Sequence, residues 1–232
     1  METERLVVKT NDGSPTVFVP ALNEHYHSVH GAYTEAIHVF QKNGLELLEN
    51  KSTLQIFEMG FGTGLNALVA LNYAIQNNIN VYYESIEKYP LNNQHFQKIK
   101  YAPFFNVSAN QSLYKYEETI QNAEWDKVVR INHLFSVKKI REDIVNFTPL
   151  PNSFNLIFFD AFGPRAQHEM WQLGVLEKMF GALLKNGYLV TYCANGQMKR
   201  NLKSLGFIVN TVKGPPGKRE MTVALKTIDD LK

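Results

Sequence analysis

The sequence has little cysteine, little net charge and no long hydrophobic run. Its single cysteine, Cys193, rules out an intramolecular disulfide and favours a reducing compartment. The formal net charge of +2 neither requires nor excludes a nucleic-acid partner. No segment approaches the roughly 20 apolar residues that span a bilayer, and the N-terminus has no run resembling a signal peptide. These absences predict a cytoplasmic protein with no membrane partner.

The composition is that of a globular protein, with 44% apolar and 20% charged residues. The chain has no internal repeat, no low-complexity tract and no clear linker. We predict an N-terminal extension over residues 1–50 that packs on a catalytic domain over residues 51–232. In the extension, a hairpin turns at Asn11-Asp12-Gly13, and a helix runs from about Thr34 to Asn43.

Apolar strands alternate with helical patterns from residue 54 onward. One helix is predicted over Leu65–Ile75, and a second has an apolar face that continues to Leu184 before stopping at Asn186-Gly187. This alternation predicts an α/β fold, a Rossmann-like open sheet that is mostly parallel with an antiparallel final strand. The predicted strands are Leu54–Glu58, Val81–Ile86, Val137–Arg141, Phe154–Phe159, Tyr188–Cys193, Phe207–Val212 and Met221–Lys226.

A glycine-rich turn follows the first of these strands. Gly60, Gly62 and Gly64 allow a sharp turn in which the backbone comes close to a ligand. The helix that begins there offers free amides to an anionic group such as a carboxylate. Leu65 stands where a dinucleotide-binding motif needs its third glycine, and no Walker Lys-Ser/Thr pair is present. The turn therefore argues against NAD, FAD and a phosphate-binding P-loop.

Two acidic residues accompany the glycine turn. Glu87 follows the second strand, where a carboxylate can accept hydrogen bonds from both hydroxyls of an adenosine ribose. We favour that role over a plain surface acid. Glu58 precedes the turn, and its position suits cofactor contact and loop bracing equally. Together with the glycines, these acids resemble the motifs of class I methyltransferases, which use S-adenosylmethionine.

Asp160 directly follows the strongly apolar strand Phe154–Phe159. In an open α/β sheet this places a partly desolvated carboxylate beside the cofactor. Methyl transfer from a sulfonium needs a nucleophile with a free lone pair in line with the breaking bond. A carboxylate can orient an amine nucleophile and accept its proton. We therefore predict a catalytic role for Asp160, with a structural loop cap as the alternative.

Two further clusters are weaker. The segment Lys213–Glu220 is a turn with three cations, equally suited to a solvated hairpin tip and to contact with phosphates. His25, His27 and His30 have a spacing that suggests a metal site, but no carboxylate or cysteine obviously completes it in the same segment. We predict no metal.

Several segments together resemble the methyltransferase domain of the tRNA 5-methylaminomethyl-2-thiouridine biosynthesis protein MnmC. The resemblance extends from about Phe18 to Leu225. The glycine turn is generic, whereas the Asp-x-Phe-x-Pro…Met-Trp and Lys-Arg-Glu-Met segments are specific. The segments that carry the resemblance are Ser28–Glu35, Glu58–Asn66, Ser85–Pro90, Phe159–Pro164 with Met170-Trp171, and Lys218–Met221.

The resemblance implies a reaction and a set of site residues. The methyl donor would be S-adenosylmethionine, and the substrate would be tRNA with a 5-aminomethyl group on its wobble uridine. The exocyclic amine would be methylated, with Asp160 facing it. The implied cofactor-binding residues are Glu58, Gly60, Phe61, Gly62, Thr63, Gly64, Asn66, Glu87, Lys88 and Asp143, the last near the adenine. The implied substrate-binding residues are Tyr33, Glu35, Phe162, Lys218 and Arg219.

The sequence departs from this family in two ways. Many members carry a C-terminal FAD-dependent oxidase, whereas this chain ends at Lys232 and is expected to act as a stand-alone methyltransferase. His27 and His38 stand where the family tends to have aromatic residues. Three alternatives are a small-molecule amine methyltransferase, an aminopropyltransferase and a non-catalytic binding module. Thr63 disfavours the aminopropyltransferase, which expects an acidic residue inside the glycine turn.

Overall fold

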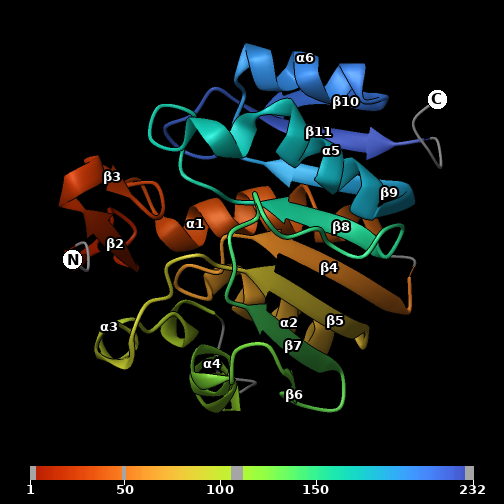
Figure 1. Cartoon of the computed structure of the whole chain (residues 1–232). Helices are drawn as coiled ribbons and strands as arrows, with labels where there is room; N and C mark the ends of the chain where they lie inside the picture. The colour runs from red at the N-terminus through yellow and green to blue at the C-terminus, as the bar shows by residue number, and fades with distance from the viewer. Residues whose placement is uncertain (1–3, 49–50, 106–111, 228–232) are drawn as a thin grey trace.

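The structure is a computed structural model that describes residues 4–48, 51–105 and 112–227. Its centre is an eight-stranded sheet with the order β10-β11-β9-β8-β4-β5-β7-β6 (Figure 1). Neighbouring strands from β9 through β7 pair in parallel, and β6, β10 and β11 pair antiparallel. The bounds are β4 Thr53–Met59, β5 Asn80–Ile86, β6 Val128–Arg130, β7 Phe135–Ile140, β8 Phe154–Phe159, β9 Leu183–Thr191, β10 Phe207–Lys213 and β11 Glu220–Lys226. The predicted fold class is confirmed.

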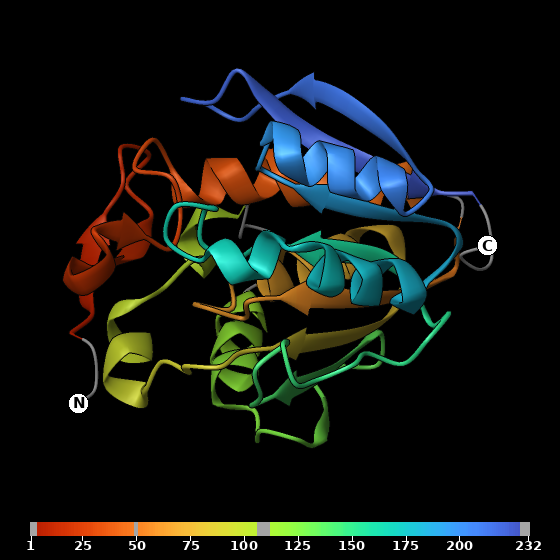
Figure 2. The ribbon, with the colours of Figure 1, turned by 45° about the horizontal axis from the view of Figure 1, so that its top comes forward.

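The sheet is covered on both faces because alternate residues of its central strands enter two different cores. Ile56 of β4 packs in one core and Phe57 in the other. Helices α2 (Leu65–Asn77) and α4 (Ser112–Asn122) cover the first face, together with α1 (Ala32–Ala36) and its π-helical continuation η2 (Ile37–Lys42). Helices α5 (Leu173–Ala182) and α6 (Gly196–Ser204) cover the other (Figure 2).

The N-terminal residues form a separate three-stranded sheet, with β1 (Leu6–Lys9), β2 (Pro15–Val19) and β3 (Glu24–His25). It lies beyond the carboxyl ends of the parallel strands (Figure 1). The predicted hairpin is confirmed, and its turn is tied to α1 because the Asp12 carboxylate accepts hydrogen bonds from both the amide and the hydroxyl of Thr34. The predicted boundary after residue 50 falls at residues outside the description, so the division into two parts stays a prediction.

The predicted end of the second helix was wrong. Leu183 and Leu184 belong to β9, and α5 ends at Ala182. The amides of Asn152 and Ser153 donate to the carbonyls of Gly181 and Ala182, which satisfies the last turn of the helix. Both leucines continue the helical spacing of apolar residues, so periodicity alone did not reveal this boundary.

Short helices complete the described parts of the chain. They are η1 (Pro20–Leu22), η3 (Leu45–Leu48), α3 (Asn93–Lys98), η4 (Ala102–Phe104) and η6 (His168–Trp171). No helix within residues 4–48, 51–105 and 112–227 has the length and apolar character needed to cross a bilayer.

Candidate active site

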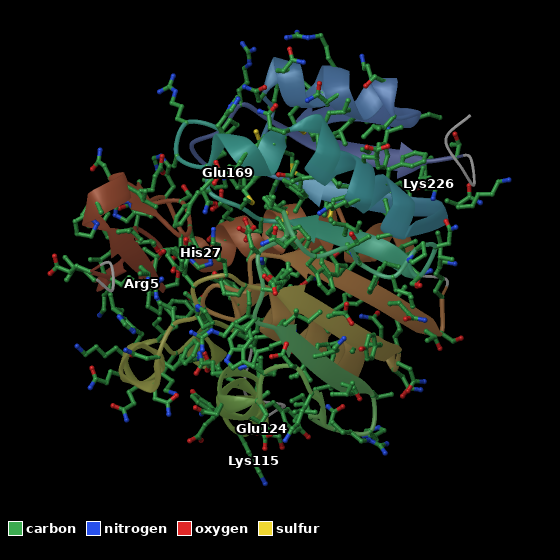
Figure 3. The ribbon with its side chains drawn as sticks, viewed as in Figure 1. Arg5, His27, Lys115, Glu124, Glu169 and Lys226 are labelled. Atoms are coloured by element: carbon green, nitrogen blue, oxygen red, sulfur yellow. The ribbon has the colours of Figure 1, made fainter. Side chains whose placement is uncertain are left out.

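The strand order reverses at β4, because the chain continues to β5 on one side and returns to β8 on the other. Ligands of open α/β sheets bind at such a point, outside the carboxyl ends of the strands. A cavity of about 390 Å³ lies there. Arg5, His27 and Glu169 all line it. Figure 3 shows these three residues on one side of the molecule and Lys226 on the other.

The glycine turn forms the floor of this cavity. Gly60, Gly62 and Gly64 all have φ angles in the left-handed region, at 92°, 50° and 80°. A Cβ atom on Gly60 would come within 2.5 Å of the Asp160 carbonyl oxygen. The turn therefore needs glycine to bring the ends of β4 and β8 into direct backbone contact.

Glu87 lies beside the turn, and each of its carboxylate oxygens accepts a hydrogen bond from a backbone amide. Its Oε2 accepts from the Gly62 amide at 3.1 Å, and its Oε1 accepts from the Tyr89 amide at 2.8 Å. A carboxylate oxygen can accept more than one hydrogen bond, so each retains capacity for a ligand hydroxyl. This fixed carboxylate lines the cavity and suits a ribose diol.

The end of the cavity beside β5 and β7 is partly apolar, with Ile86 and Ile144 in its lining. Lys88 and Asp143 form an ion pair of 2.8 Å at this end. The Asp143 side chain is 17% exposed, while that of Lys88 is 47% exposed. An adenine ring fits the chemistry of this end, since its faces are apolar and its edge needs polar partners.

Asp160 lines the opposite end of the same cavity. The Asn66 amide donates to its Oδ2 at 2.8 Å. Burial raises the pKa of Asp160 to about 7, the negative Glu35 adds to this effect, and the Asn66 hydrogen bond and Lys218 oppose it. A carboxylate with such a pKa is suited to accept a proton near neutral pH.

A second cavity, of about 360 Å³, adjoins the first. Tyr26, His27 and Phe162 line both cavities, and the rings of Tyr26 and Phe162 meet edge to face with centroids 5.2 Å apart. The second cavity is also lined by Tyr192 and by an ion pair between Glu35 and Lys218. The aromatic pair therefore lies between the first cavity and the second.

Lys218 is held in place on the second cavity from two sides. Its ammonium pairs with Glu35, whose other oxygen accepts from the Ser28 amide at 2.7 Å. The same ammonium lies 3.8 Å from the centroid of the Tyr192 ring, a cation–π contact. The Lys218 side chain is only partly exposed and lines the second cavity.

The structure brings most of the predicted site residues together. Those that line the first cavity are Gly60, Phe61, Gly62, Thr63, Asn66, Glu87, Lys88, Asp143, Asp160 and Phe162. Glu35 and Lys218 line the second, as does Phe162. Four predicted residues line neither cavity.

Those four have other surroundings. Glu58 is fully buried beneath the turn, and Gly64 is the N-cap of α2. Tyr33 packs on Phe104 and Phe105, and Arg219 is 91% exposed on the turn before β11. Their roles in ligand binding stay predictions.

Sequence reasoning missed the contribution of the N-terminal sheet to the site. Arg5, Val19, Leu22, Tyr26 and His27 line the first cavity. Burial lowers the pKa of His27 to about 4, so its ring is neutral at physiological pH. Among the described residues, no three His, Cys, Asp or Glu side chains are arranged so that they could hold a metal ion. No local pattern signalled that this segment would reach the cofactor cavity.

The residues present fit S-adenosylmethionine. Gly60 and Gly62 line the first cavity with backbone that carries no side chain, and Glu87 offers a carboxylate to a diol. The same cavity joins an apolar end to the buried Asp160. Its volume is within the range of small-molecule sites.

Comparison with known families agrees with this geometry. Residues 109–227, just over half of the sequence, match a family described as S-adenosyl-L-methionine-dependent methyltransferase. The chain belongs to this family, and S-adenosylmethionine is its cofactor.

Individual relatives narrow the resemblance to the methyltransferase part of MnmC, which confirms the prediction from the motifs. The chain is 27% identical over 88% of its length to the tRNA 5-methylaminomethyl-2-thiouridine biosynthesis bifunctional protein MnmC of Methylobacillus flagellatus. It is 29% identical over 94% of its length to the protein of that name from Cupriavidus metallidurans. The matched region is 33% of each relative, so the chain spans about a third of their length.

A solved structure gives the same relationship in three dimensions. The crystal structure of MNMC2 from Aquifex aeolicus superposes with a TM-score of 0.79 at 26% identity. The match covers 99% of this chain and 73% of that one. The match therefore includes both the N-terminal sheet and the glycine turn.

Proposed function

We propose that this methyltransferase acts on the exocyclic amine of 5-aminomethyl-(2-thio)uridine at the wobble position of tRNA. The names of its relatives support a substrate in tRNA. The observation that carries the proposal is the Asp160 carboxylate, buried at one end of the cofactor cavity and electrostatically coupled to Glu35 and Lys218 of the second cavity. A small-molecule amine remains the competing substrate class, but no feature of the site favours it.

The second cavity suits a pyrimidine base turned out of the RNA. Tyr26, Phe162 and Tyr192 provide aromatic surface, and enzymes that modify a base commonly read it by stacking and hydrogen bonds in such a pocket. The anchored Lys218 ammonium can donate to a base carbonyl or thiocarbonyl oxygen or sulfur. A substituent on the base would then point across the Tyr26–Phe162 pair toward Asp160.

Cations near the second cavity support contact with an RNA backbone. Arg219 is 91% exposed beside Lys218, and Lys199 reaches the same turn through its ion pair with Glu220. Phosphate contacts by exposed lysine and arginine position a nucleic acid without reading its sequence. Arg219 of the turn and Lys199 of α6 would therefore hold the tRNA while the pocket selects the base.

The proposed reaction moves one methyl group and one proton. S-Adenosylmethionine supplies the methyl group as a sulfonium that becomes a neutral thioether. The amine lone pair forms the new N–C bond as the S–C bond breaks, and Asp160 accepts the proton that the nitrogen loses. Asn66 orients the carboxylate through its 2.8 Å hydrogen bond.

The proposed substrate can be tested with bulk tRNA from a strain that lacks this protein. Incubated with labelled S-adenosylmethionine and the protein, this tRNA is expected to gain one methyl group on 5-aminomethyl uridines, as read by nucleoside mass analysis. Labelling is expected to fall steeply as salt rises, because exposed cations compete with counterions for phosphates.

Bulk tRNA from the parent strain is the matched control and is expected to accept little label, since its sites are already methylated. Label on a different nucleoside, or on a small amine but never on tRNA, would contradict the proposed substrate.

A further inference from the structure

A buried polar cluster lies beneath the glycine turn and is not explained by cofactor contact. It joins Glu58 of β4, Tyr83 and Ser85 of β5, and Asn66 in the first turn of α2. Glu58, Ser85 and Tyr83 have no exposed surface, and Asn66 is 3% exposed. A carboxyl group in such a place needs a specific reason to be there.

The register of the strands brings these groups together. Glu58 of β4 pairs directly with Ser85 of β5, and two residues earlier Ile56 pairs with Tyr83. Side chains two residues apart share a face, so Glu58, Ser85 and Tyr83 all lie on the face that α2 covers. The Ser85 hydroxyl donates to Glu58 Oε2 at 2.7 Å. On the other side, the Asn66 amide donates to Asp160 Oδ2. The cluster therefore extends from the centre of the sheet to the catalytic carboxylate.

Three atoms of this cluster are buried without a hydrogen-bond partner among the described residues: Glu58 Oε1, Asn66 Oδ1 and the Tyr83 hydroxyl oxygen. Buried polar atoms are nearly always paired, so three in one place indicate that a hydrogen is unaccounted for. The Asn66 amide has its orientation set by Asp160, because its NH₂ group must face the carboxylate. Its Oδ1 therefore needs a donor, and an ionised Glu58 has none to offer.

We propose that Glu58 carries a proton and acts as a positioning residue, donating from Oε1 to Asn66 Oδ1 and so fixing the amide that holds Asp160. One added proton satisfies the cluster. Tyr83 donates to Glu58, Glu58 donates to Asn66, and Asn66 donates to Asp160. With an ionised Glu58, the acceptors Glu58 Oε1 and Asn66 Oδ1 would both be buried without a hydrogen to share.

The surroundings of Glu58 favour its neutral form. Burial raises the pKa of Glu58 to about 8, the Ser85 hydroxyl opposes this, and the nearby Asp160 charge reinforces it. The side chains of Asn66 and Tyr83 lie close enough to act on the carboxyl as hydrogen-bonding neighbours, and both lower its pKa, so burial outweighs them. No cation of the described residues is among the groups that act on this carboxyl. A neutral carboxylic acid that donates a hydrogen bond is an established way to use such a site.

This inference rests on the proposed role of Asp160, and two readouts separate it from that role. Infrared spectra of the protein with ¹³C-labelled glutamate are expected to show a protonated carboxyl band at pH 7 that Glu58→Gln removes. This measurement needs no RNA substrate, so it tests the protonation of Glu58 even if tRNA is not the substrate.

The second readout is the pH dependence of turnover in two variants. Turnover is expected to fall at acid pH as Asp160 becomes protonated, and we call this fall the acid limb. Glu58→Gln is expected to keep turnover within about threefold and to leave the pH of the acid limb unchanged, because its NH₂ group replaces the donor and no charge changes. Glu58→Ala removes the donor and is expected to lower turnover about tenfold or more, with the acid limb moved to higher pH as the Asn66–Asp160 bond loosens.

Glu84→Gln is the matched control, since Glu84 is also a buried glutamate of the sheet but pairs with Lys138. It is expected to leave the pH profile unchanged. An unaltered carboxyl band in Glu58→Gln, or an acid limb that moves to lower pH in that variant, would overturn the proposal. The second result would mean that a negative charge beside Asp160 had been removed. If Glu58→Ala does not fold, the infrared spectrum and the pH profile of Glu58→Gln still test whether Glu58 carries a proton.

Discussion

The Asp160→Asn variant is expected to transfer methyl groups about 10²-fold or more slowly than the parent while keeping its affinity for S-adenosylmethionine within several-fold. Asparagine preserves the shape of the side chain and can still accept from Asn66, but it cannot take up the proton of the amine. Single-turnover methylation and calorimetric binding of S-adenosylmethionine measure the two quantities separately.

The pH dependence of the parent gives an internal control for this variant. Burial raises the pKa of Asp160 to about 7, and the base works only in its ionised form. Turnover of the parent is therefore expected to fall as pH drops below about 7, and the variant is expected to lack this limb. A raised pKa means that ionised Asp160 destabilises the folded state at pH values above the unfolded pKa. Asparagine carries no charge, so the free energy of unfolding should not fall in the variant. Equal activity of the two proteins would remove Asp160 from the mechanism.

The Gly60→Ala variant is expected to lose at least tenfold in affinity for S-adenosylmethionine and about 2 kcal/mol of folding stability. Gly60 has a φ of 92°, which strains an L-residue, and the new Cβ would lie 2.5 Å from the Asp160 carbonyl oxygen. The strands β4 and β8 would have to separate at the floor of the cavity. Urea unfolding and cofactor titration measure the two losses.

Gly181→Ala provides a matched substitution. Gly181 lies in α5, and a Cβ there meets no atom of the described residues within 4 Å. The change is expected to leave cofactor affinity unaltered and to raise stability slightly, because alanine favours a helix more than glycine does. If both variants bound cofactor as well as the parent, the glycine turn would not be the cofactor loop.

The central part of the site could be predicted from short stretches of sequence. The glycine turn, Glu87 and Asp160 each follow a strand whose apolar pattern is clear, and the rule for open α/β sheets places strand ends together. The structure brings all three to one cavity. These predictions needed only local patterns and one topological rule.

Other parts depended on contacts between distant residues. Tyr26 and His27 line the first cavity from the N-terminal segment, whose hairpin turn is hydrogen-bonded to α1 through Asp12, and no local pattern encodes this placement. Helix α4 was not predicted, since its mean composition is polar and few of its residues are buried. The burial of Glu58 also depends on the pairing of β4 with β5 and on the position of α2, so the sequence left its role open.

A crystal structure of the protein with S-adenosylhomocysteine tests the account most directly. We expect the ligand in the 390 Å³ cavity, with its ribose hydroxyls on Glu87, its adenine near Ile144 and its sulfur facing the Asp160 end. A ligand bound elsewhere, or a sulfur turned away from Asp160, would contradict the assignment of this cavity and of its catalytic carboxylate.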